Sequence, residues 1–458
     1  MSAIEDEDRI SALPNDILLE ILECLDLRAA IQASTVARRW RHLPYQLSHL
    51  LISVTDFHDD AGRTTDQIMK AYTDAKTRLL LCPPTLTCGR IIKRLQLSFY
   101  LIDPYLTSIG NAVGDAVKSG ETEWLEFAAC ADVDRPSDDQ LVLFGQRLMS
   151  FSNACPGAFK ALTKLTLQNL AFENSDVTNL LNTCNKLKLL SLRSCELVQE
   201  SSLEIDAPCS ELGALELICF GCIQVDLICL PKLRQLVYDT WYGENPSVSC
   251  GCVPQLDQVC LASPALSWQT PFVLSQCLSS NSNMTVLHLN FRTEMIWIKP
   301  EDPRHLRPIF SKLRDVHLYN IFAECDLNWT LFILEVKVLL RSSLGYINWE
   351  NSWIVCNYED SASKTNLVWE TSNFKHLNLK LLAMEGFEEV EKVMNYIRLV
   401  MEQAVSLKRI ELPDKIPCKK CNAINLELPR FPVDELSKQR VREKLSYGLS
   451  SSAEIIIG

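Results

Sequence analysis

The 458-residue sequence contains neither a long uninterrupted apolar run nor the features of a secretory leader. No uncharged apolar stretch approaches the ~18 residues that a membrane span requires. The first ten residues, MSAIEDEDRI, are acidic and lack the basic and apolar regions of a signal peptide. We therefore expect a soluble protein of the cytoplasm or nucleus, without a membrane partner.

The sequence also lacks an excess of basic residues. It has 45 Lys and Arg against 57 Asp and Glu, which gives a formal net charge of −12. An acidic chain is poorly suited to bind nucleic acid, so no nucleic-acid partner is expected. Hydrophobic residues make up 47% and charged residues 22% of the chain, a balance that excludes wholesale disorder.

Catalytic and cofactor-binding motifs are missing as well. The sequence contains no G-x-G-x-x-G, G-K-[ST], H-E-x-x-H or G-x-S-x-G pattern. None of the seven histidines stands at ligand spacing from another. The sequence therefore predicts a non-catalytic protein without a cofactor.

Cysteine is plentiful but does not form the short framework of a secreted domain, because the 19 cysteines are scattered through the chain. Most lie beside Leu, Ile or Val, where a free thiol packs as a small hydrophobic group. Three close pairs are candidate zinc ligands: Cys219 with Cys222, Cys250 with Cys252, and Cys418 with Cys421. Since the spacing between pairs matches no common zinc finger, buried thiols are the favoured interpretation and no metal is expected.

Residues 13–26, LPNDILLEILECLD, have the pattern of a helix whose apolar surface is wider than a small bundle needs. Five side chains fall within an arc of roughly 140° at about 100° per residue: Ile17, Leu18, Ile21, Leu22 and Leu25. Asn15 is expected to cap this helix, and LRAAIQAST and VARRWRHL predict two more helices. Because about 35 residues are too few to fold alone, the surplus apolar surface is predicted to dock on another protein.

The same segment, from DRISALPND to RRWRHL, resembles the F-box motif. In that family the motif binds a Skp-type adaptor, which bridges to a cullin scaffold and a ubiquitin-conjugating enzyme. The resemblance implies that nine residues form or support the adaptor-binding face: Leu13, Pro14, Ile17, Leu18, Ile21, Leu22, Leu25, Val36 and Trp40.

Two other interpretations of these helices stay open. Three short helices ending in RRWR are compatible with a DNA-binding helix-turn-helix, although residues 1–45 hold five Arg against eight Asp or Glu and offer little basic surface. The helices are also compatible with an ordinary N-terminal cap on the rest of the chain.

An internal repeat occupies most of the remaining sequence. Segments such as LTKLTL, LGALEL, LDQVCL and LRDVHL fit the apolar-x-x-apolar-x-apolar strand of a leucine-rich repeat. The middle apolar residues are 21 to 29 positions apart, close to the ~20–29 residue period of this class: Leu165, Leu190, Leu215, Leu236, Val259, Leu287 and Val316. Degenerate strands are expected at Ile91–Phe99 and Glu123–Cys130.

One repeat cannot bury its own apolar face, so the strands must stack side by side. The predicted fold is α/β: an N-terminal three-helix F-box followed by a curved leucine-rich-repeat solenoid with a parallel sheet on the concave face. Polar residues that alternate with the leucines, such as Thr166, Ser191 and His288, are expected to point to the concave face.

The C-terminal part departs from the period. Asp326–Leu340 reads as a buried helix, a strand or both, and residues 373–415 predict a strand, a turn at Gly386, a helix and another strand. This last segment resembles the FBD module at the C-terminus of many plant F-box proteins. Since no Gly/Ser/Pro-rich spacer separates Cys325 from Asn373, we expect the repeats and the C-terminal segment to form one continuous solenoid.

A basic cluster near residue 305 is a candidate phosphate site if its side chains converge on the concave face, because some hormone-sensing members of the wider family bind an inositol phosphate. A solvated loop is the favoured interpretation. The cluster consists of Lys299, Arg304, Arg307, Lys312 and Arg314.

The resemblance to plant F-box/leucine-rich-repeat proteins covers nearly the whole chain. It divides the sequence into an acidic tail (1–8), an F-box (9–50), a connecting segment (51–90), repeats (91–372), an FBD-like segment (373–415) and a tail packed on the solenoid end (416–458). The implied function is substrate recognition in a Skp-cullin-F-box ubiquitin ligase, with an unknown target protein on the repeats. The alternative is a leucine-rich-repeat scaffold for protein interactions outside a ubiquitin ligase.

Overall fold

The structure is a computed structural model of the chain. It describes residues 10–458 except 11–12, 26, 59–61, 81–90, 119–120, 134, 265, 267, 280–281, 293–295, 323–326, 337–343, 351–368, 370–374, 377 and 415–430. The chain forms two compact units. The first unit is Met1–Gln199 with Cys209–Glu216, and the second is Glu200–Pro208 with Leu217–Gly458.

The first unit begins with helices, as predicted. They are α1 (Asn15–Glu23), α2 (Leu27–Val36) and the 3-10 helix η1 (Arg38–Gln46). Pro44 lies inside η1 and has no amide hydrogen to donate to an α-helical ladder. The strand β1 (His49–Ser53), the 3-10 helix η2 (Val54–Phe57) and α3 (Thr65–Leu80) follow.

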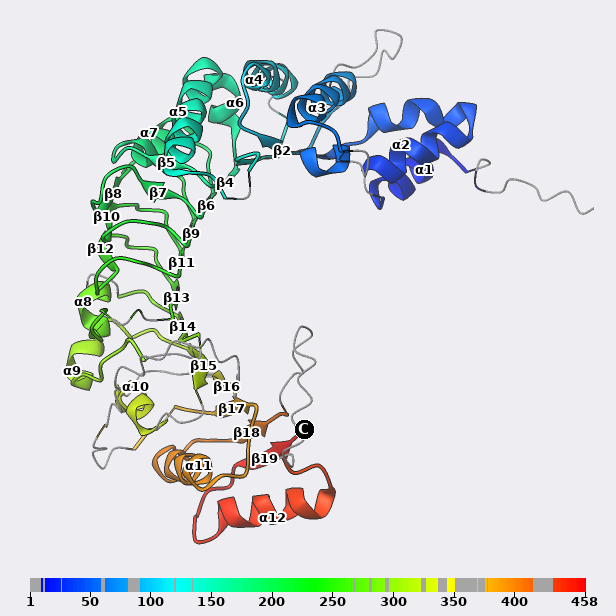
Figure 1. Ribbon diagram of the computed structural model, residues 1–458. Coiled ribbons are helices and arrows are strands. Elements are labelled where there is room, and N and C mark those ends of the chain that lie inside the picture. The colour runs from blue at the N-terminus through cyan, green and yellow to red at the C-terminus, as the bar shows by residue number, and fades with distance from the viewer. Residues whose placement is uncertain are drawn as a thin grey trace, which may run out of the picture. The chain divides into compact units, whose positions relative to one another are not determined.

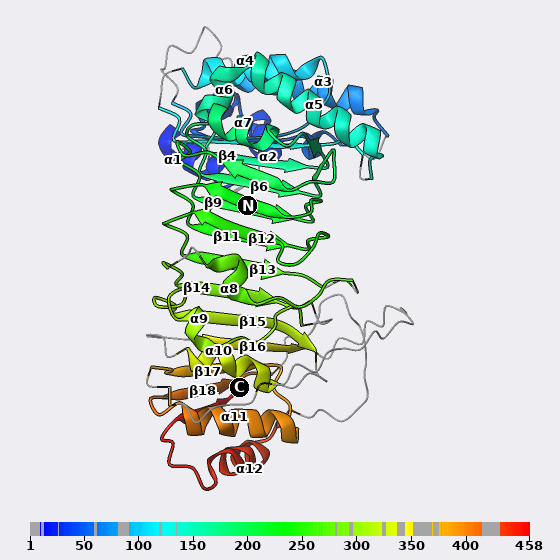
Figure 2. The same ribbon diagram turned by 90° about the vertical axis from the view of Figure 1, so that its left-hand side faces the viewer.

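The main sheet of the first unit is parallel, with the strand order β1-β2-β3-β4-β6. The remaining strands are β2 (Arg94–Tyr100), β3 (Trp124–Cys130), β4 (Lys164–Gln168) and β6 (Leu189–Arg193), and β5 (Ala171–Phe172) pairs with β7 (Glu196–Leu197). Helices cover one face of this sheet (Figures 1 and 2): α4 (Tyr105–Ala116), α5 (Asp138–Ala154), α6 (Pro156–Ala161) and α7 (Asp176–Thr183).

Aromatic packing joins the helices to the strands in this unit. The Phe127 ring contacts Phe99, Phe151 and Phe159 at centroid distances of 5.3, 6.1 and 5.8 Å. All four side chains are at most 3% exposed. Because such aromatic pairs add to the area they bury, this cluster fixes α5 and α6 on the sheet.

The second unit holds two parallel sheets. The larger has the order β11-β13-β14-β15-β16-β17-β18-β19, and its first strands are β11 (Gln235–Asp239), β13 (Gln258–Ala262), β14 (Val286–Asn290) and β15 (Asp315–Phe322). The smaller sheet, which the sequence did not predict, has the order β12-β10-β8: β8 (Leu203–Asp206), β10 (Val225–Cys229) and β12 (Val248–Cys252). The strand β9 (Ala214–Ile218) lies where the chain passes between the units.

The same backbone junction recurs from repeat to repeat. The Thr163 carbonyl accepts from the amides of Lys188 and Leu189, and the Lys188 carbonyl from those of Gly213 and Ala214. This junction sets each strand in register with the next, so the predicted leucines stack. Of the seven middle apolar residues, Val316 is 7% exposed and each of the others 0%. The helical N-terminus and the parallel repeat sheets confirm the predicted α/β class.

The C-terminal segment continues the larger sheet. The 3-10 helix η3 (Leu327–Thr330) and α10 (Leu331–Glu335) show that the described part of 326–340 is helical. The strand–turn–helix–strand prediction for 373–415 is confirmed by β17 (Leu381–Glu385), Gly386 at φ 70°, α11 (Glu391–Gln403) and β18 (Arg409–Leu412). The Lys380 carbonyl accepts from the amides of Lys408 and Arg409, which is the junction of the earlier repeats.

Two further strands and one helix belong to this part of the chain. The strand β16 (Leu344–Glu350) pairs with both β15 and β17, so parallel pairing runs from the repeats into the C-terminal segment. The strand β19 (Glu454–Ile457) pairs with β18. The helix α12 (Glu435–Ser446) is held by Arg398 of α11, whose guanidinium donates to the carbonyls of Lys444, Leu445 and Tyr447.

Candidate interaction surfaces

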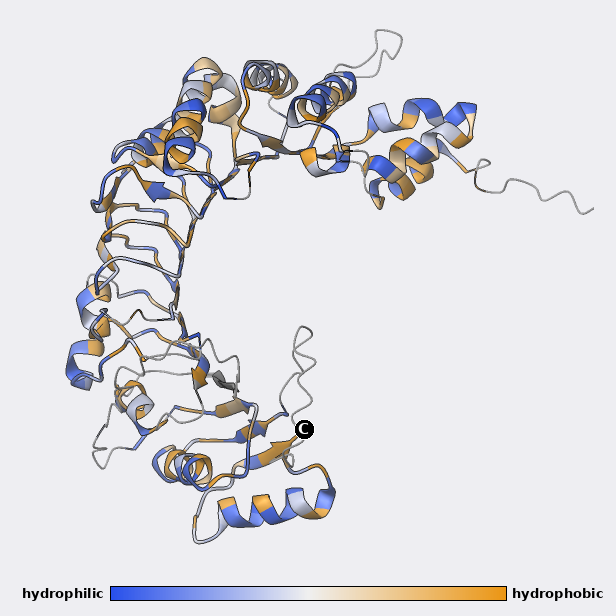
Figure 3. Cartoon of the chain, in the orientation of Figure 1, coloured by the Kyte–Doolittle hydropathy of each residue, from blue (hydrophilic) through white to orange (hydrophobic). Residues whose placement is uncertain are grey.

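The apolar residues of α1 divide into a buried and an exposed set. Leu18 and Leu22 are each 1% exposed and belong to the core of the N-terminal helices. Ile17 and Ile21 of α1, and Leu25 two residues beyond its end, are 38%, 39% and 42% exposed and stand at i, i+4, i+8 spacing. Figure 3 shows hydrophobic residues gathered along α1. The wide apolar arc therefore packs through Leu18 and Leu22. Its other three residues, Ile17, Ile21 and Leu25, stay open to solvent and are here called the apolar row.

The other predicted adaptor-binding residues occupy different environments. Pro14 and Val36 are exposed, and Leu13 and Trp40 are half-buried. Two further exposed apolar residues, Ile10 at 55% and Ile31 at 39%, escaped the prediction, since no apolar periodicity in AAIQAST marks the face of Ile31. Six of the 20 large hydrophobic side chains that are exposed in the described residues lie between positions 10 and 36. Exposed apolar surface is thus concentrated at the N-terminal helices.

The predicted capping role of Asn15 is wrong. The helix α1 begins at Asn15 itself, and the N-cap position belongs to Pro14, whose side chain makes no capping bond. The Asn15 Oδ1 instead accepts hydrogen bonds from Arg39 Nε at 3.0 Å and Nη2 at 2.8 Å. Because a charged guanidinium donates both bonds, this contact fixes the start of α1 against η1.

A second polar contact holds the end of α1 against the first repeat strand. The Glu23 carboxylate accepts from Ser48 N at 3.0 Å and Ser48 Oγ at 2.7 Å, and it lies 3.7 Å from His49 Nδ1. A pocket of about 270 Å³ lies beside this contact, lined by side chains of α1, α2, β1 and β2 that include Leu25 and Arg94. The N-terminal helices are therefore tied by defined contacts to the strands that follow.

Among the residues that the structure describes, the helices beside the larger sheet of the second unit lie on one of its faces. Figures 1 and 2 both place α8 (Leu274–Leu278), α9 (Pro303–Leu306) and α10 on that face, and we call the opposite face the open face. His288 lies on the open face, since it alternates with the buried Leu287 and Leu289. In the first unit Thr166 and Ser191 are register partners and share a face.

Comparison with known proteins identifies the repeats. A family model described as "At1g61320/AtMIF1, LRR domain" matches residues 147–434, more than half of the chain. The chain belongs to this leucine-rich-repeat family. A second model, described as F-box-like, matches residues 10–48, so the predicted resemblance to F-box proteins with leucine-rich repeats is confirmed.

The curated relatives of this F-box/leucine-rich-repeat protein come from Arabidopsis thaliana. F-box protein At3g60790 is 24% identical over 221 residues, which are 43% of this chain and 42% of the relative. Putative F-box/FBD/LRR-repeat protein At3g49030 is 24% identical over 47% of this chain and 48% of the relative. F-box/FBD/LRR-repeat protein At3g26920 is 26% identical over 45% and 46%. The chain spans less than half the length of each of these relatives.

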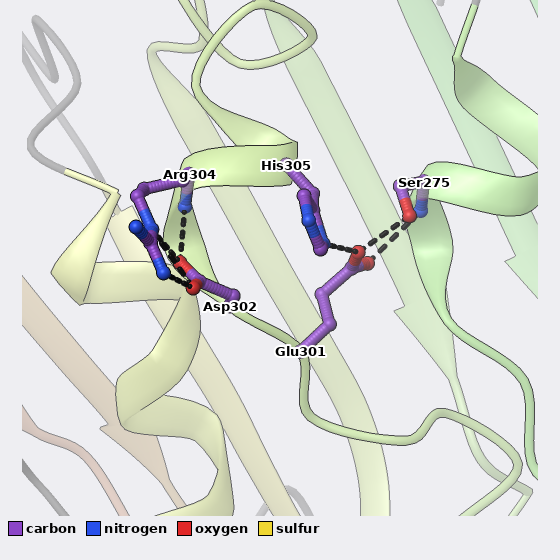
Figure 4. Close-up of polar contacts among 5 residues, drawn as sticks. All are labelled: Ser275, Glu301, Asp302, Arg304 and His305. Carbon is purple, nitrogen blue, oxygen red and sulfur yellow. Dashed lines mark hydrogen bonds and ion pairs between the residues drawn. The ribbon is translucent and has the colours of Figure 1, made fainter.

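Two members of the basic cluster of this F-box/leucine-rich-repeat protein are already engaged by polar side chains. Arg304 belongs to α9 on the helix-bearing face, where its guanidinium donates to Asp302 from Nε at 2.9 Å and from Nη2 at 2.5 Å (Figure 4). This hydrogen bonding lowers the pKa of Asp302 to about 2. Lys312 donates to the Asn283 side chain. These partners therefore occupy two of the five cations that the phosphate interpretation needs, which favours the solvated-loop interpretation for Arg304 and Lys312.

The neighbouring Glu301 links two repeats. It is 7% exposed, and its carboxylate accepts from Ser275 N at 2.9 Å and Ser275 Oγ at 2.5 Å (Figure 4). His305 Nδ1 lies 3.8 Å from the same carboxylate. Because a buried carboxylate must be hydrogen-bonded to be tolerated, Glu301 has a structural role between α8 and α9.

The cysteines of the candidate zinc pairs that the structure describes do not gather into a metal-binding group. Burial raises the pKa of the Cys222 thiol to about 11 and that of Cys250 to about 12, which opposes the thiolate form that zinc needs. Cys418 and Cys421 lie outside the described residues. Within the described part of the chain, no group of three or more His, Cys, Asp or Glu is arranged to hold a metal ion. Of the helices described there, none combines the length and apolar character of a bilayer crossing.

Proposed function

We propose that the protein is the substrate-recognition subunit of a Skp-cullin-F-box ubiquitin ligase of the cytoplasm or nucleus. The F-box docks on a Skp-type adaptor and through it on a cullin, and the repeats bind a target protein for ubiquitination. The observation that carries this proposal is the apolar row of α1, exposed within residues 10–48 that match the F-box-like model. In this scheme the chain itself catalyses no reaction.

Its contribution is proximity. Holding a target and a ubiquitin-charged enzyme in one assembly converts a bimolecular transfer into an effectively intramolecular one. The chain must therefore bind the adaptor tightly. The apolar row offers three side chains for this contact, each about 40% exposed. Full burial of such a side chain contributes roughly 1.5–3 kcal/mol, so covering the exposed remainder contributes about 1 kcal/mol for each.

The double substitution Ile21→Asp/Leu25→Asp tests the adaptor contact. An unpaired buried carboxylate costs several kcal/mol, and each 1.4 kcal/mol is a tenfold loss of affinity. Both side chains are already partly in water, so the core formed by Leu18 and Leu22 should persist. We expect co-purification with the adaptor to be lost, while circular dichroism stays that of the parent.

The chain offers a matched control. Val433 and Leu436 are 70% and 86% exposed at the start of α12, so Val433→Asp/Leu436→Asp adds the same two charges at an exposed apolar site of the second unit. This variant should bind the adaptor like the parent. If the Ile21→Asp/Leu25→Asp protein also co-purifies with the adaptor, the chain acts instead as a leucine-rich-repeat scaffold outside a ubiquitin ligase.

A further inference from the structure

Three planar side chains stack on the open face of the second unit. His288 of β14 and His317 of β15 are register partners, and their rings lie 4.3 Å apart at an interplanar angle of 5°. The Tyr319 ring is 5.8 Å from His288 and 5.9 Å from His317, with angles of 3° and 8°. We call His288, His317 and Tyr319 the aromatic ladder. Because the two histidine rings lie face to face, each covers one face of the other, and only the outer ring faces of the ladder can accept a further planar group.

The ladder is uncharged at neutral pH. Burial, the proximity of His317 and the opposing effect of Asp315 together lower the pKa of His288 to about 4, and burial lowers the pKa of His317. Two positive charges at a ring spacing of 4.3 Å would also repel each other. The ladder thus presents neutral rings, whose faces attract cations.

An unused acceptor lies at the end of the ladder. Asp315 precedes His317 by two residues on β15 and therefore shares its face. Within the described residues the Asp315 carboxylate makes no hydrogen bond and no ion pair, and burial raises its pKa. Arg314 and His288 act in the opposite direction and lower the pKa of Asp315, but burial outweighs them. A half-buried carboxylate without a hydrogen-bond donor is stabilised when a binding partner supplies one.

The surrounding charges select against an acidic partner. Glu385 of β17 is 6% exposed and acts electrostatically on Tyr319. Asp239 of β11 forms an ion pair with Arg292 beside Cys260, so the Arg292 cation is already held by a carboxylate. Around the ladder the carboxylates of Asp239, Asp315 and Glu385 thus accompany neutral rings, and the cations beside them are Arg292, which is paired with Asp239, and Arg314, which acts on Asp315.

We infer that the aromatic ladder and Asp315 form the seat for an arginine side chain of the target protein. A guanidinium is planar, stacks on aromatic faces and donates two parallel hydrogen bonds to a carboxylate. A lysine ammonium provides the charge without the plane, so the site discriminates arginine from lysine. This inference rests on the proposed role of the repeats in binding a target protein.

Fluorescence anisotropy with defined peptides tests the site on the full-length chain. The probes are fluorescein-labelled Gly/Ser peptides of one length that carry three Arg, three Lys, three citrulline or three Glu. We expect the Arg peptide to bind at least fivefold more tightly than the Lys peptide, and the citrulline and Glu peptides not to bind. Asp315→Asn, which keeps the side-chain shape, and His288→Ala/His317→Ala should each weaken Arg-peptide binding at least tenfold.

Asp206→Asn is the matched control, because it removes one carboxylate from the exposed end of β8 on the smaller sheet. Its affinity should equal that of the parent. Equal binding of Arg and Lys peptides, unchanged binding by Asp315→Asn, or no binding of the Arg peptide up to 1 mM would each overturn the inference. Co-purification of the parent chain with the adaptor is measured in a separate assay. A parent chain that binds the Arg peptide but not the adaptor would refute the ligase proposal and support the arginine site.

Discussion

Replacing Lys76 by Met should stabilise the protein at neutral pH. Lys76 lies on α3, is 0% exposed, and donates from Nζ to the Ser108 carbonyl at 3.0 Å and to Ser108 Oγ at 3.4 Å. Burial lowers the pKa of its ammonium from 10.5 to about 8. That difference corresponds to roughly 3 kcal/mol lost to keeping the buried group charged at pH 7. Met has a similar shape without the charge.

The pH dependence gives the sign of the effect. Between pH 8 and 10.5 the unfolded chain binds more protons at Lys76 than the folded chain, so the parent gains stability as the pH rises through this window. The advantage of Lys76→Met should therefore be largest at pH 7 and shrink toward pH 10.5. Urea unfolding combined with hydrogen exchange of the α3 amides measures it locally.

Lys70→Met provides the control for this prediction. Lys70 lies on the same helix but is exposed, so its replacement should change the unfolding free energy measured at α3 by no more than about 0.5 kcal/mol. A gain for Lys76→Met that stays constant from pH 7 to 10.5, or one that Lys70→Met matches, would refute the reasoning.

Three other predictions concern packing and assembly. In Gly145→Ala the new Cβ meets the Ala171 carbonyl oxygen at 1.8 Å, so α5 should separate from β5 and thermal unfolding should show a loss of about 1–3 kcal/mol. In Gly157→Ala the new Cβ meets nothing within 4 Å, so this variant should be more stable by about 0.5–1 kcal/mol. Limited proteolysis should release no stable fragment that begins near residue 370, because β16 pairs with strands on both sides; recovery of such a fragment would contradict the continuous sheet. Expressed alone, the chain should aggregate through its apolar row, and co-expression with the adaptor should restore monodisperse protein; equal yields without the adaptor would count against this.

Much of the repeat architecture could be predicted from the sequence, because leucines that stack on one another leave a periodic signal. Leu165, Leu190 and Leu215 are all buried, each as the second residue of its strand. The C-terminal prediction succeeded for the same reason: Val393, Ile397 and Val400 of α11 show the period of a helix that is buried on one side.

The features that escaped prediction depend on register or on neighbours far away in the sequence. Strand β1 lies at the end of the predicted F-box, where HLLIS is too short for a periodic signal to separate it from the helices. The smaller sheet is made from segments between the leucine strands, and its strands have only four or five residues, so the alternation in LEID is too short to stand out. His288 and His317 are 29 residues apart, so only the pairing of β14 with β15 reveals that they stack.

The division of α1 into buried and exposed residues could not be read from the helical wheel either. Leu18 and Ile17 are neighbours in the same apolar arc, yet they are 1% and 38% exposed. The difference arises because α1 packs against η1, where Leu43 is buried and Arg39 holds Asn15. A wheel gives directions on one helix, whereas burial depends on which side its neighbours occupy.

Light scattering of the full-length chain mixed with a Skp-type adaptor tests the central claim most directly. Substitutions are preferable to removal of residues 1–50 for this test, because His49–Ser53 form the edge strand β1 of the first sheet. The account predicts a 1:1 complex for the parent and for Val433→Asp/Leu436→Asp, and two separate species for Ile21→Asp/Leu25→Asp. A parent chain that stays separate from the adaptor, or a complex that survives the two aspartates in the apolar row, would contradict it.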